Sequence, residues 1–187
     1  MTWLIGLAVL AVLGYGAWTY NRLVHDRNLV AQGFADIDVQ LKRRADLVPR
    51  LVEVVRGYAA HERSTLDAVT ELRSRASALA AESSDLPGPQ AARFAAESGL
   101  GQALQRLLVL QENYPTLKAD ANFRDLSAKL VEVEDHLQYA RRFYNGAVQQ
   151  YVTRLQSFPD LLVAQVFAFK PAAFFETDDR AAVAVQL

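Results

Sequence analysis

Eighteen consecutive residues, from Trp3 to Tyr20 (WLIGLAVLAVLGYGAWTY), carry no charged side chain, and the first charge belongs to Arg22. Because a helix rises 1.5 Å per residue, this run covers roughly 27 Å, close to the ~30 Å hydrocarbon core of a bilayer. Trp3 lies at one end, and Trp18 with Tyr20 at the other, where membrane interfaces favour aromatic rings. We therefore predict a transmembrane anchor over residues 1–21.

The side chains expected to face lipid are apolar or aromatic: Trp3, Leu4, Ile5, Leu7, Val9, Leu10, Val12, Leu13, Trp18 and Tyr20. A cleaved signal peptide is the alternative, because Gly14-Tyr15-Gly16 resembles a small-x-small cleavage site. No Lys or Arg precedes the run, which is also longer than a usual signal h-region, so a retained anchor is favoured. Arg22, Arg27 and Lys42 follow the run, and this positive flank predicts an outside N-terminus and a cytoplasmic remainder.

About 165 residues remain after the anchor, the size of one ordinary domain. Lys and Arg number 20 and Asp and Glu 21, for a formal charge of -1, so no basic surplus favours a nucleic-acid partner. The chain has no cysteine, which excludes disulfides, thiolate metal ligands and cysteine nucleophiles. The domain must therefore be held together by packing.

Apolar residues recur at steps of three and four through the second half of the chain, which predicts one long helix with a coiled-coil-like seam. The seam residues are Phe123, Leu126, Leu130, Val133, Leu137, Ala140, Tyr144, Ala147 and Tyr151, then Leu155 and Phe158 after one slip.

A similar alternation predicts helix after the anchor, from Leu23 to Leu79. It includes Val30, Phe34, Ile37, Leu41, Val48, Leu51, Val55, Tyr58, Val69, Leu72 and Ala76, with polar residues at Arg27, Arg44, Glu62 and Thr65. Pro49 either kinks this helix or lies in the first turn of a new one capped by Asp46. The unbroken phase favours the kink, whereas the great length favours a turn, toward which our interpretation leans.

Residues 83–89 (SSDLPGP) read as a linker, because two prolines around a glycine cannot continue a helix. A third helix is expected from about Gln90 to Asn113, and Ser157-Phe158-Pro159 ends the fourth. Short connections favour antiparallel neighbours. The sequence thus predicts an all-α fold, in which the transmembrane helix precedes an antiparallel up-and-down four-helix bundle over residues 22–176, with a flexible tail over 177–187.

The closing segment from Leu161 to Phe175 (LLVAQVFAFKPAAFF) is strongly apolar, yet too short to span a bilayer. It either lies in the membrane interface beside the anchor or folds back over the end of the bundle. The residues that would touch the interface are Leu161, Leu162, Val166, Phe167, Phe169, Phe174 and Phe175.

Seven short segments between Tyr20 and Glu176 form a recognisable set: Tyr20-Asn21-Arg22-Leu23-Val24, Ile37-Asp38-Val39-Gln40-Leu41, Asp46-Leu47-Val48-Pro49, Gly57-Tyr58-Ala59-Ala60-His61-Glu62, Glu112-Asn113-Tyr114-Pro115-Thr116-Leu117, Ala140-Arg141-Arg142-Phe143-Tyr144-Asn145 and Phe158-Pro159. In these segments, and in their order along the chain, the sequence resembles the LemA family. The chain departs from the family pattern at Gly33-Phe34-Ala35, where a tryptophan is usual, at Arg50, where asparagine is common, and at Pro171-Ala172-Ala173-Phe174-Phe175-Glu176.

The resemblance implies a single-pass protein of the bacterial inner membrane with an N-terminal anchor and a four-helix bundle, and it favours the turn at Pro49. It supplies no biochemical activity. A similar protein takes part in forming magnetosome membranes, which suggests a role in membrane organisation by analogy alone.

Catalytic and metal-binding signals are weak. His61-Glu62 begins like a zincin motif, but Thr65 stands where the second histidine is needed. Glu132, Glu134, Asp135 and His136 read as a solvated helix face, and no serine-hydrolase, phosphate-loop or dinucleotide motif occurs. We expect no enzyme activity, no metal and no cofactor.

Lys42, Arg43 and Arg44 form a basic cluster near the end of the first helix after the anchor, where cations suit the helix dipole. Such a cluster is either a solvated face or a partner contact, and Phe143, off the seam, is a second candidate for a partner surface. The leading hypothesis is a membrane-tethered scaffold or adaptor that binds a protein partner or another copy of itself. Membrane remodelling, through the anchor and residues 161–175, is the alternative.

Overall fold

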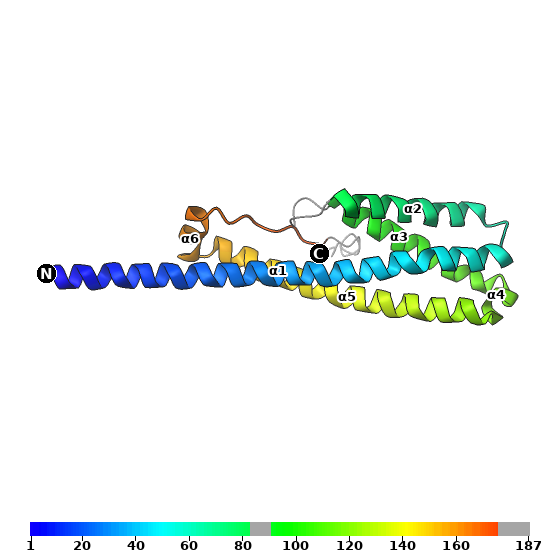
Figure 1. Cartoon of the computed structure of the whole chain (residues 1–187), viewed down its shortest axis with the longest axis horizontal. Helices are drawn as coiled ribbons and strands as arrows, with labels where there is room; N and C mark the ends of the chain where they lie inside the picture. Colours follow the sequence, from blue (N-terminus) through cyan, green and yellow to red (C-terminus); the bar gives the residue numbers. More distant parts are fainter. Residues whose placement is uncertain (83–90, 176–187) are drawn as a thin grey trace, which may run out of the picture.

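The computed structural model describes residues 1–82 and 91–175, and these ranges form helices without any strand (Figure 1). The all-α prediction is confirmed. The elements are α1 (Thr2–Tyr58), α2 (Arg63–Glu82), α3 (Ala91–Val109), the 3₁₀ helix η1 (Leu110–Glu112), α4 (Pro115–Ala119), α5 (Ala121–Gln156) and α6 (Asp160–Val166). The predicted linker at 83–89 and tail at 177–187 lie outside the described residues.

Helix α1 is a single helix of 57 residues that begins in the apolar run and continues through Pro49. The predicted turn at Pro49 is therefore wrong. A proline has no N–H for the carbonyl four residues earlier, but Arg73 Nε of α2 donates to that Ala45 carbonyl oxygen at 3.0 Å. Pro49 is also exposed, so its ring is not part of the buried core. The helix can thus continue past the proline.

The chain turns instead at residues 59–62, between α1 and α2. Ala59 N donates to Val55 O at 2.8 Å, and Glu62 N donates to Ala59 O at 3.0 Å. Ala59 is buried, whereas Tyr58, expected on the seam, is exposed and hydrogen-bonds Asp120. The apolar alternation predicted to continue through Glu62 and Thr65 is thus interrupted by the boundary between α1 and α2.

Helix α5 follows the predicted seam closely. Asp120 caps its start by accepting a hydrogen bond from Phe123 N at 2.8 Å. Its buried residues are Phe123, Leu126, Leu130, Val133, Leu137, Ala140, Tyr144, Val148, Tyr151 and Leu155. Val148 replaces the expected Ala147, and Phe158 is 80 % exposed rather than buried, because α5 ends two residues before it.

Helices α1 and α5 lie side by side and run in opposite directions (Figure 1). Arg44 pairs with Glu134, while Asp26 pairs with Arg154, so rising numbers on one helix meet falling numbers on the other. Gly33 permits a close approach, since a Cβ there would lie 3.1 Å from Tyr144 Cα. Helices α2 and α3 pack against each other and cover only the part of the α1–α5 pair far from the N-terminus (Figure 1).

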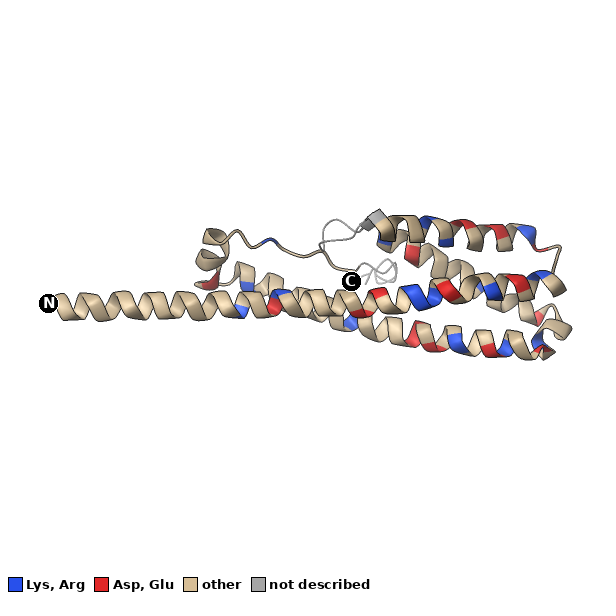
Figure 2. Ribbon diagram, in the orientation of Figure 1, with Lys and Arg blue, Asp and Glu red and all other residues tan. Residues whose placement is uncertain are grey.

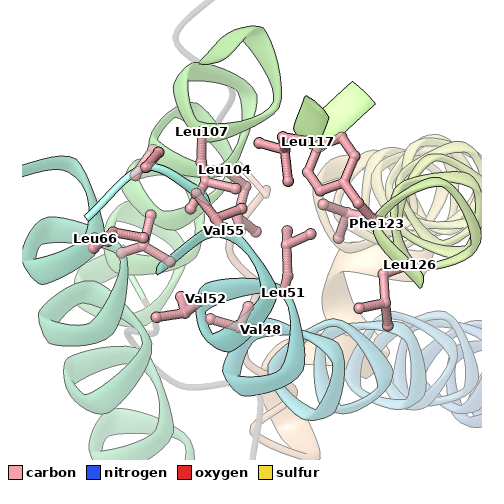
Figure 3. Close-up of a cluster of buried hydrophobic side chains, with 14 of the residues drawn as sticks. Val48, Leu51, Val52, Val55, Leu66, Leu104, Leu107, Leu117, Phe123 and Leu126 are labelled. Atoms are coloured by element: carbon pink, nitrogen blue, oxygen red, sulfur yellow. The ribbon is translucent and has the colours of Figure 1, made fainter. Parts of the chain in front are cut away.

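The buried apolar side chains form two clusters. The distal cluster joins α1, α2, α3, α4 and α5 around residues such as Leu51, Val55, Leu104, Leu117 and Phe123 (Figure 3). The proximal cluster lies nearer the N-terminus and joins α1 and α5 to α6, to Phe94 of α3 and to Phe175. Where α2 and α3 do not reach, the chain after α6 covers the helix pair.

Candidate functional site

The N-terminal part of α1 makes almost no contact with the rest of the protein. Side chains from Met1 to Trp18 are exposed apart from the half-buried Gly16, and no charged residue lies in this stretch (Figure 2). By length and composition, α1 is the one helix among the described residues that could cross a membrane. A protruding apolar helix of this kind is a candidate membrane site.

Helix α6 lies beside the C-terminal end of the apolar run. Tyr15 OH donates to Asp160 Oδ1 at 3.2 Å, and Thr19 Oγ1 lies 3.4 Å from the same oxygen. The Tyr20 ring packs against Phe167 and Phe169, with centroids 4.7 and 5.6 Å away. We call residues 15–20 together with the end of α5 and α6 the membrane-side end.

Buried charges next to the membrane-side end are paired. Asp26, almost fully buried, accepts hydrogen bonds from Arg154 Nε at 2.5 Å and from Gln150 Nε2 at 3.1 Å. Arg154 Nη1 lies 3.8 Å from Asp160 Oδ2. One arginine of α5 thereby links acids of α1 and α6, which compensates the cost of removing these carboxylates from water.

The expected interface residues divide into two groups. Leu162, Val166 and Phe167 are 54, 78 and 58 % exposed around α6, and Phe174 is 38 % exposed. Leu161 and Phe169 are half-buried. Phe175 is buried, which contradicts its assignment to the interface.

Phe175 is buried because the chain after α6 runs back along α5. Its ring packs on Phe94 with centroids 4.1 Å apart, and the Arg141 guanidinium lies 4.5 Å from its centroid. Asn145 makes two hydrogen bonds to the backbone of Phe175. Its Oδ1 accepts from Phe175 N at 2.8 Å, and its Nδ2 donates to Phe175 O at 3.0 Å.

Two tyrosines of α5 fix the same returning segment. Tyr144 OH donates to Ala173 O at 2.7 Å, and Tyr151 OH donates to Lys170 O at 3.1 Å. Burial raises the pKa of Tyr144 to about 12, so its hydroxyl stays a donor at neutral pH. The sequence marks Tyr144 and Tyr151 as seam residues but gives no sign that their hydroxyls hold a backbone segment.

Arg44 is fully buried, so its assignment to an exposed partner surface is wrong. Its Nη2 lies 2.5 Å from Glu97 Oε2 and 2.8 Å from Glu97 O, while Nη1 lies 2.8 Å from Glu134 Oε1. Gly101 leaves room for the guanidinium, because a Cβ there would lie 3.2 Å from Nη1. Arg44 thus joins α1, α3 and α5 between the two apolar clusters.

The other partner-surface candidates remain accessible: Lys42, Arg43 and Phe143 are exposed. Phe143 also shields Gly33, since a Cβ on that glycine would lie 3.0 Å from Phe143 Cδ1. Sequence reasoning missed Tyr139, which is 66 % exposed on α5.

The acidic and histidine residues considered for chemistry lie apart. Glu62 accepts a hydrogen bond from Tyr114 OH at 3.1 Å, and His61 is exposed. His136 Nε2 lies 3.7 Å from Glu132 Oε1 on an exposed helix face. Within residues 1–82 and 91–175, no group of three or more acids and histidines could hold a metal ion.

Comparison with known proteins places this architecture in a family. The LemA family model matches residues 33–187, most of the chain. The chain belongs to the LemA family.

This LemA-family chain is 25 % identical to Magnetosome protein MamQ 1 and to MamQ 2 of Paramagnetospirillum magneticum, over 91 % of the chain and 69 % of each relative. It is also 25 % identical to Protein LemA of Metamycoplasma hominis, over 85 % of the chain and 69 % of that relative. Family and apolar helix together indicate a membrane-associated helical protein in bacteria.

Proposed function

We propose that this LemA-family chain is a non-enzymatic scaffold or adaptor at the bacterial inner membrane, where an antiparallel four-helix bundle recognises a protein partner or another copy of the chain. The observation that carries the proposal is the continuity of α1. The side chains from Met1 to Leu13 at its apolar end are exposed, and the same helix, without interruption, supplies packing residues to both apolar clusters. A partner held by the bundle would thereby be held at a fixed place relative to the membrane.

Topology is testable because the chain has no cysteine. We propose an outside N-terminus and a cytoplasmic bundle, supported by Arg22 and Arg27 directly after the apolar run. Thr2→Cys should react with a membrane-impermeant maleimide on spheroplasts, whereas Lys42→Cys should react only after lysis. The reverse labelling pattern would place the bundle outside.

Partner binding is assigned to the exposed side chains of Lys42 and Arg43 on α1 and of Phe143 on α5. A photo-crosslinking amino acid at Phe143 should capture one reproducible partner band, or a dimer of the chain, in native membranes. Thr70, exposed on α2, provides the matched control position. Equal labelling at both positions, or none at either, would contradict a specific surface.

Membrane organisation is the second candidate, favoured by the exposed apolar side chains of Leu162, Val166 and Phe167 at the depth of the anchor's end. The MamQ relatives carry the name of a magnetosome protein, which also fits a membrane role. Helix α6 would then act as a second contact with the bilayer beside the anchor.

A single tryptophan can test whether α6 touches lipid. The chain has two tryptophans, Trp3 and Trp18, so replacing both with Phe leaves a chain without tryptophan fluorescence. In that background Phe167→Trp should be quenched by lipids brominated along their acyl chains, whereas Tyr139→Trp should not. Unquenched fluorescence from Phe167→Trp would remove α6 from the membrane while leaving the anchor untouched.

A further inference from the structure

A cavity of about 250 Å³ lies between the end of α5, α6 and the chain that follows α6. Val152 and Leu155 of α5, Leu161 and Ala164 of α6, and Phe169 give it an apolar lining, with only the amides of Gln156 and Gln165 as polar side chains. An apolar cavity of ~150 Å³ can hold a benzene molecule, so this one has room for a stretch of hydrocarbon chain.

The cavity lies at the end of the apolar run of α1. Phe169, which lines it, packs against Tyr20, and α6, which forms one wall, reaches Tyr15 through Asp160. Both tyrosines belong to the uncharged stretch that precedes Arg22. If α1 spans the bilayer, the cavity lies where acyl chains meet headgroups.

Two cationic side chains lie beside the cavity. The Arg27 guanidinium is 5.6 Å from the centroid of the Phe169 ring, and Lys170 is exposed between the lining residues Phe169 and Pro171. The nearby acids Asp26 and Asp160 are both engaged by Arg154. No acidic side chain within the described ranges forms a salt bridge with Arg27 or Lys170, so both charges are available to an anion.

We propose that this cavity binds one acyl chain of an anionic phospholipid, whose phosphate group lies against Arg27 and Lys170. The apolar lining suits the acyl chain, and the position at the end of the apolar run suits the boundary between hydrocarbon and headgroups. The two cations beside Phe169 favour an anionic over a zwitterionic headgroup. The assignment rests on the proposed anchor. It goes further by defining a specific lipid site rather than a general contact with the bilayer.

The test uses the full-length protein in nanodiscs of phosphatidylcholine with a small share of phosphatidylglycerol that carries a diazirine on one acyl chain. After irradiation, mass spectrometry should locate labels both in the anchor and on peptides containing residues 152–171. Labels in the anchor alone would overturn the cavity assignment while leaving the anchor intact. An absence of label in both places would overturn the anchor as well.

Ala164→Leu fills the cavity and should lower its labelling about ten-fold, the effect of losing about two buried methylene groups of the bound chain. Val166→Leu is the matched control, because Val166 lies on the same helix, is exposed and does not line the cavity. Anchor labelling should be unchanged in both variants. Unchanged cavity labelling in Ala164→Leu would contradict the proposal, and the map on the unsubstituted chain decides the question should this variant unfold.

The headgroup is tested with Arg27→Gln combined with Lys170→Gln. With the diazirine placed on phosphatidylglycerol or on phosphatidylcholine in turn, the unsubstituted protein should label more from the anionic lipid. The double variant should lose that preference and keep the cavity label. Equal labelling by both lipids before substitution would refute the preference for an anionic headgroup. Stronger cavity labelling by a diazirine fatty acid than by either phospholipid would reassign the site to free fatty acid.

Discussion

Arg44 and Glu97 form a buried ion pair that joins α1 and α3. Removing one member of a buried pair leaves the other uncompensated, whereas replacing both by apolar residues is often tolerated. Arg44→Met should therefore lower the free energy of unfolding by about 3–5 kcal/mol, and Glu97→Leu added to it should restore much of the loss. Urea unfolding of the full chain in detergent, followed by circular dichroism, measures both. A double variant no more stable than the single one would contradict this account.

Gly33 and Gly146 form a matched pair of helical glycines. A Cβ at Gly33 would lie 3.0 Å from Phe143 Cδ1 and 3.1 Å from a backbone atom of Tyr144, whereas a Cβ at Gly146 would meet nothing within 4 Å. Gly33→Ala should cost about 1–3 kcal/mol through overpacking. Gly146→Ala should gain about 0.5–1 kcal/mol, because alanine suits a helix interior better. If thermal melting showed both variants stabilised, the close approach of α1 and α5 would be wrong.

At the scale of the element, Pro49 and Arg73 together explain why α1 continues. Arg73→Met should destabilise the protein by about 1 kcal/mol, because the Ala45 carbonyl then loses its donor. With Pro49→Ala, residue 49 regains an N–H for that carbonyl, so Arg73→Met should cost less. A double-mutant cycle by urea unfolding measures the coupling. Additive effects would mean that Arg73 does not replace the missing donor.

The start of α5 should give the protein an acid-sensitive element. Asp120 accepts hydrogen bonds from Phe123 N and, at 2.9 Å, from Tyr58 OH, which lower its pKa below the ordinary value of 3.8. A carboxyl with a lowered folded-state pKa contributes stability that is complete above its unfolded-state pKa and is lost as the pH falls through the folded value.

Asp120→Asn keeps a capping oxygen but does not titrate. The unfolding free energy of this variant should therefore change less steeply below about pH 4 than that of the unsubstituted chain. Tyr58→Phe should reduce the steepness partly, since the backbone hydrogen bond remains. Urea titrations at a series of pH values provide the measurement, and identical slopes for all three proteins would exclude this role for Asp120.

Periodicity predicted α5 well because its seam residues are apolar throughout and Asp120 supplies a local cap. It failed at Pro49 because the donor that rescues the helix, Arg73, lies on a different element. It also misplaced part of the α1 seam, choosing Arg27 and Phe34, whereas the buried residues are Asp26 and Gly33. Both lie in phase with Leu23 and Val30, so strict spacing could have identified them. Gly33 was passed over because the larger Phe34 is the more usual core residue.

At the scale of the whole molecule, the apolar start of α1 could be predicted from the sequence, but the residues that pack against Tyr15 and Tyr20 could not. The uncharged run can be recognised because its residues are contiguous in the sequence. The contact of Tyr15 with Asp160 and the burial of Phe175 on Phe94 join residues far apart in the chain, through side chains that no repeating pattern marks. The candidate site therefore emerged only when α6 and the returning segment were placed against α1 and α5.

If α1 spans a bilayer, its uninterrupted length also sets how far the distal helices lie from the membrane surface. The 38 residues that follow Tyr20 up to Tyr58 extend about 57 Å at 1.5 Å per residue. A donor fluorophore on Ala60→Cys should therefore transfer much less energy to headgroup-labelled lipids than one on His25→Cys, both positions being exposed. Equal transfer efficiencies would mean that the helical body lies flat on the bilayer.

A continuous helix transmits a tilt at one end to the other end. Helices that cross bilayers tilt according to the local thickness, typically by ~20°. If α1 spans a bilayer, its unbroken course from Thr2 to Tyr58 means that each ~10° of tilt would carry the far end of α1 about 10 Å sideways. A change in local bilayer thickness would thus shift the lateral position of the distal helices and of any partner bound to them.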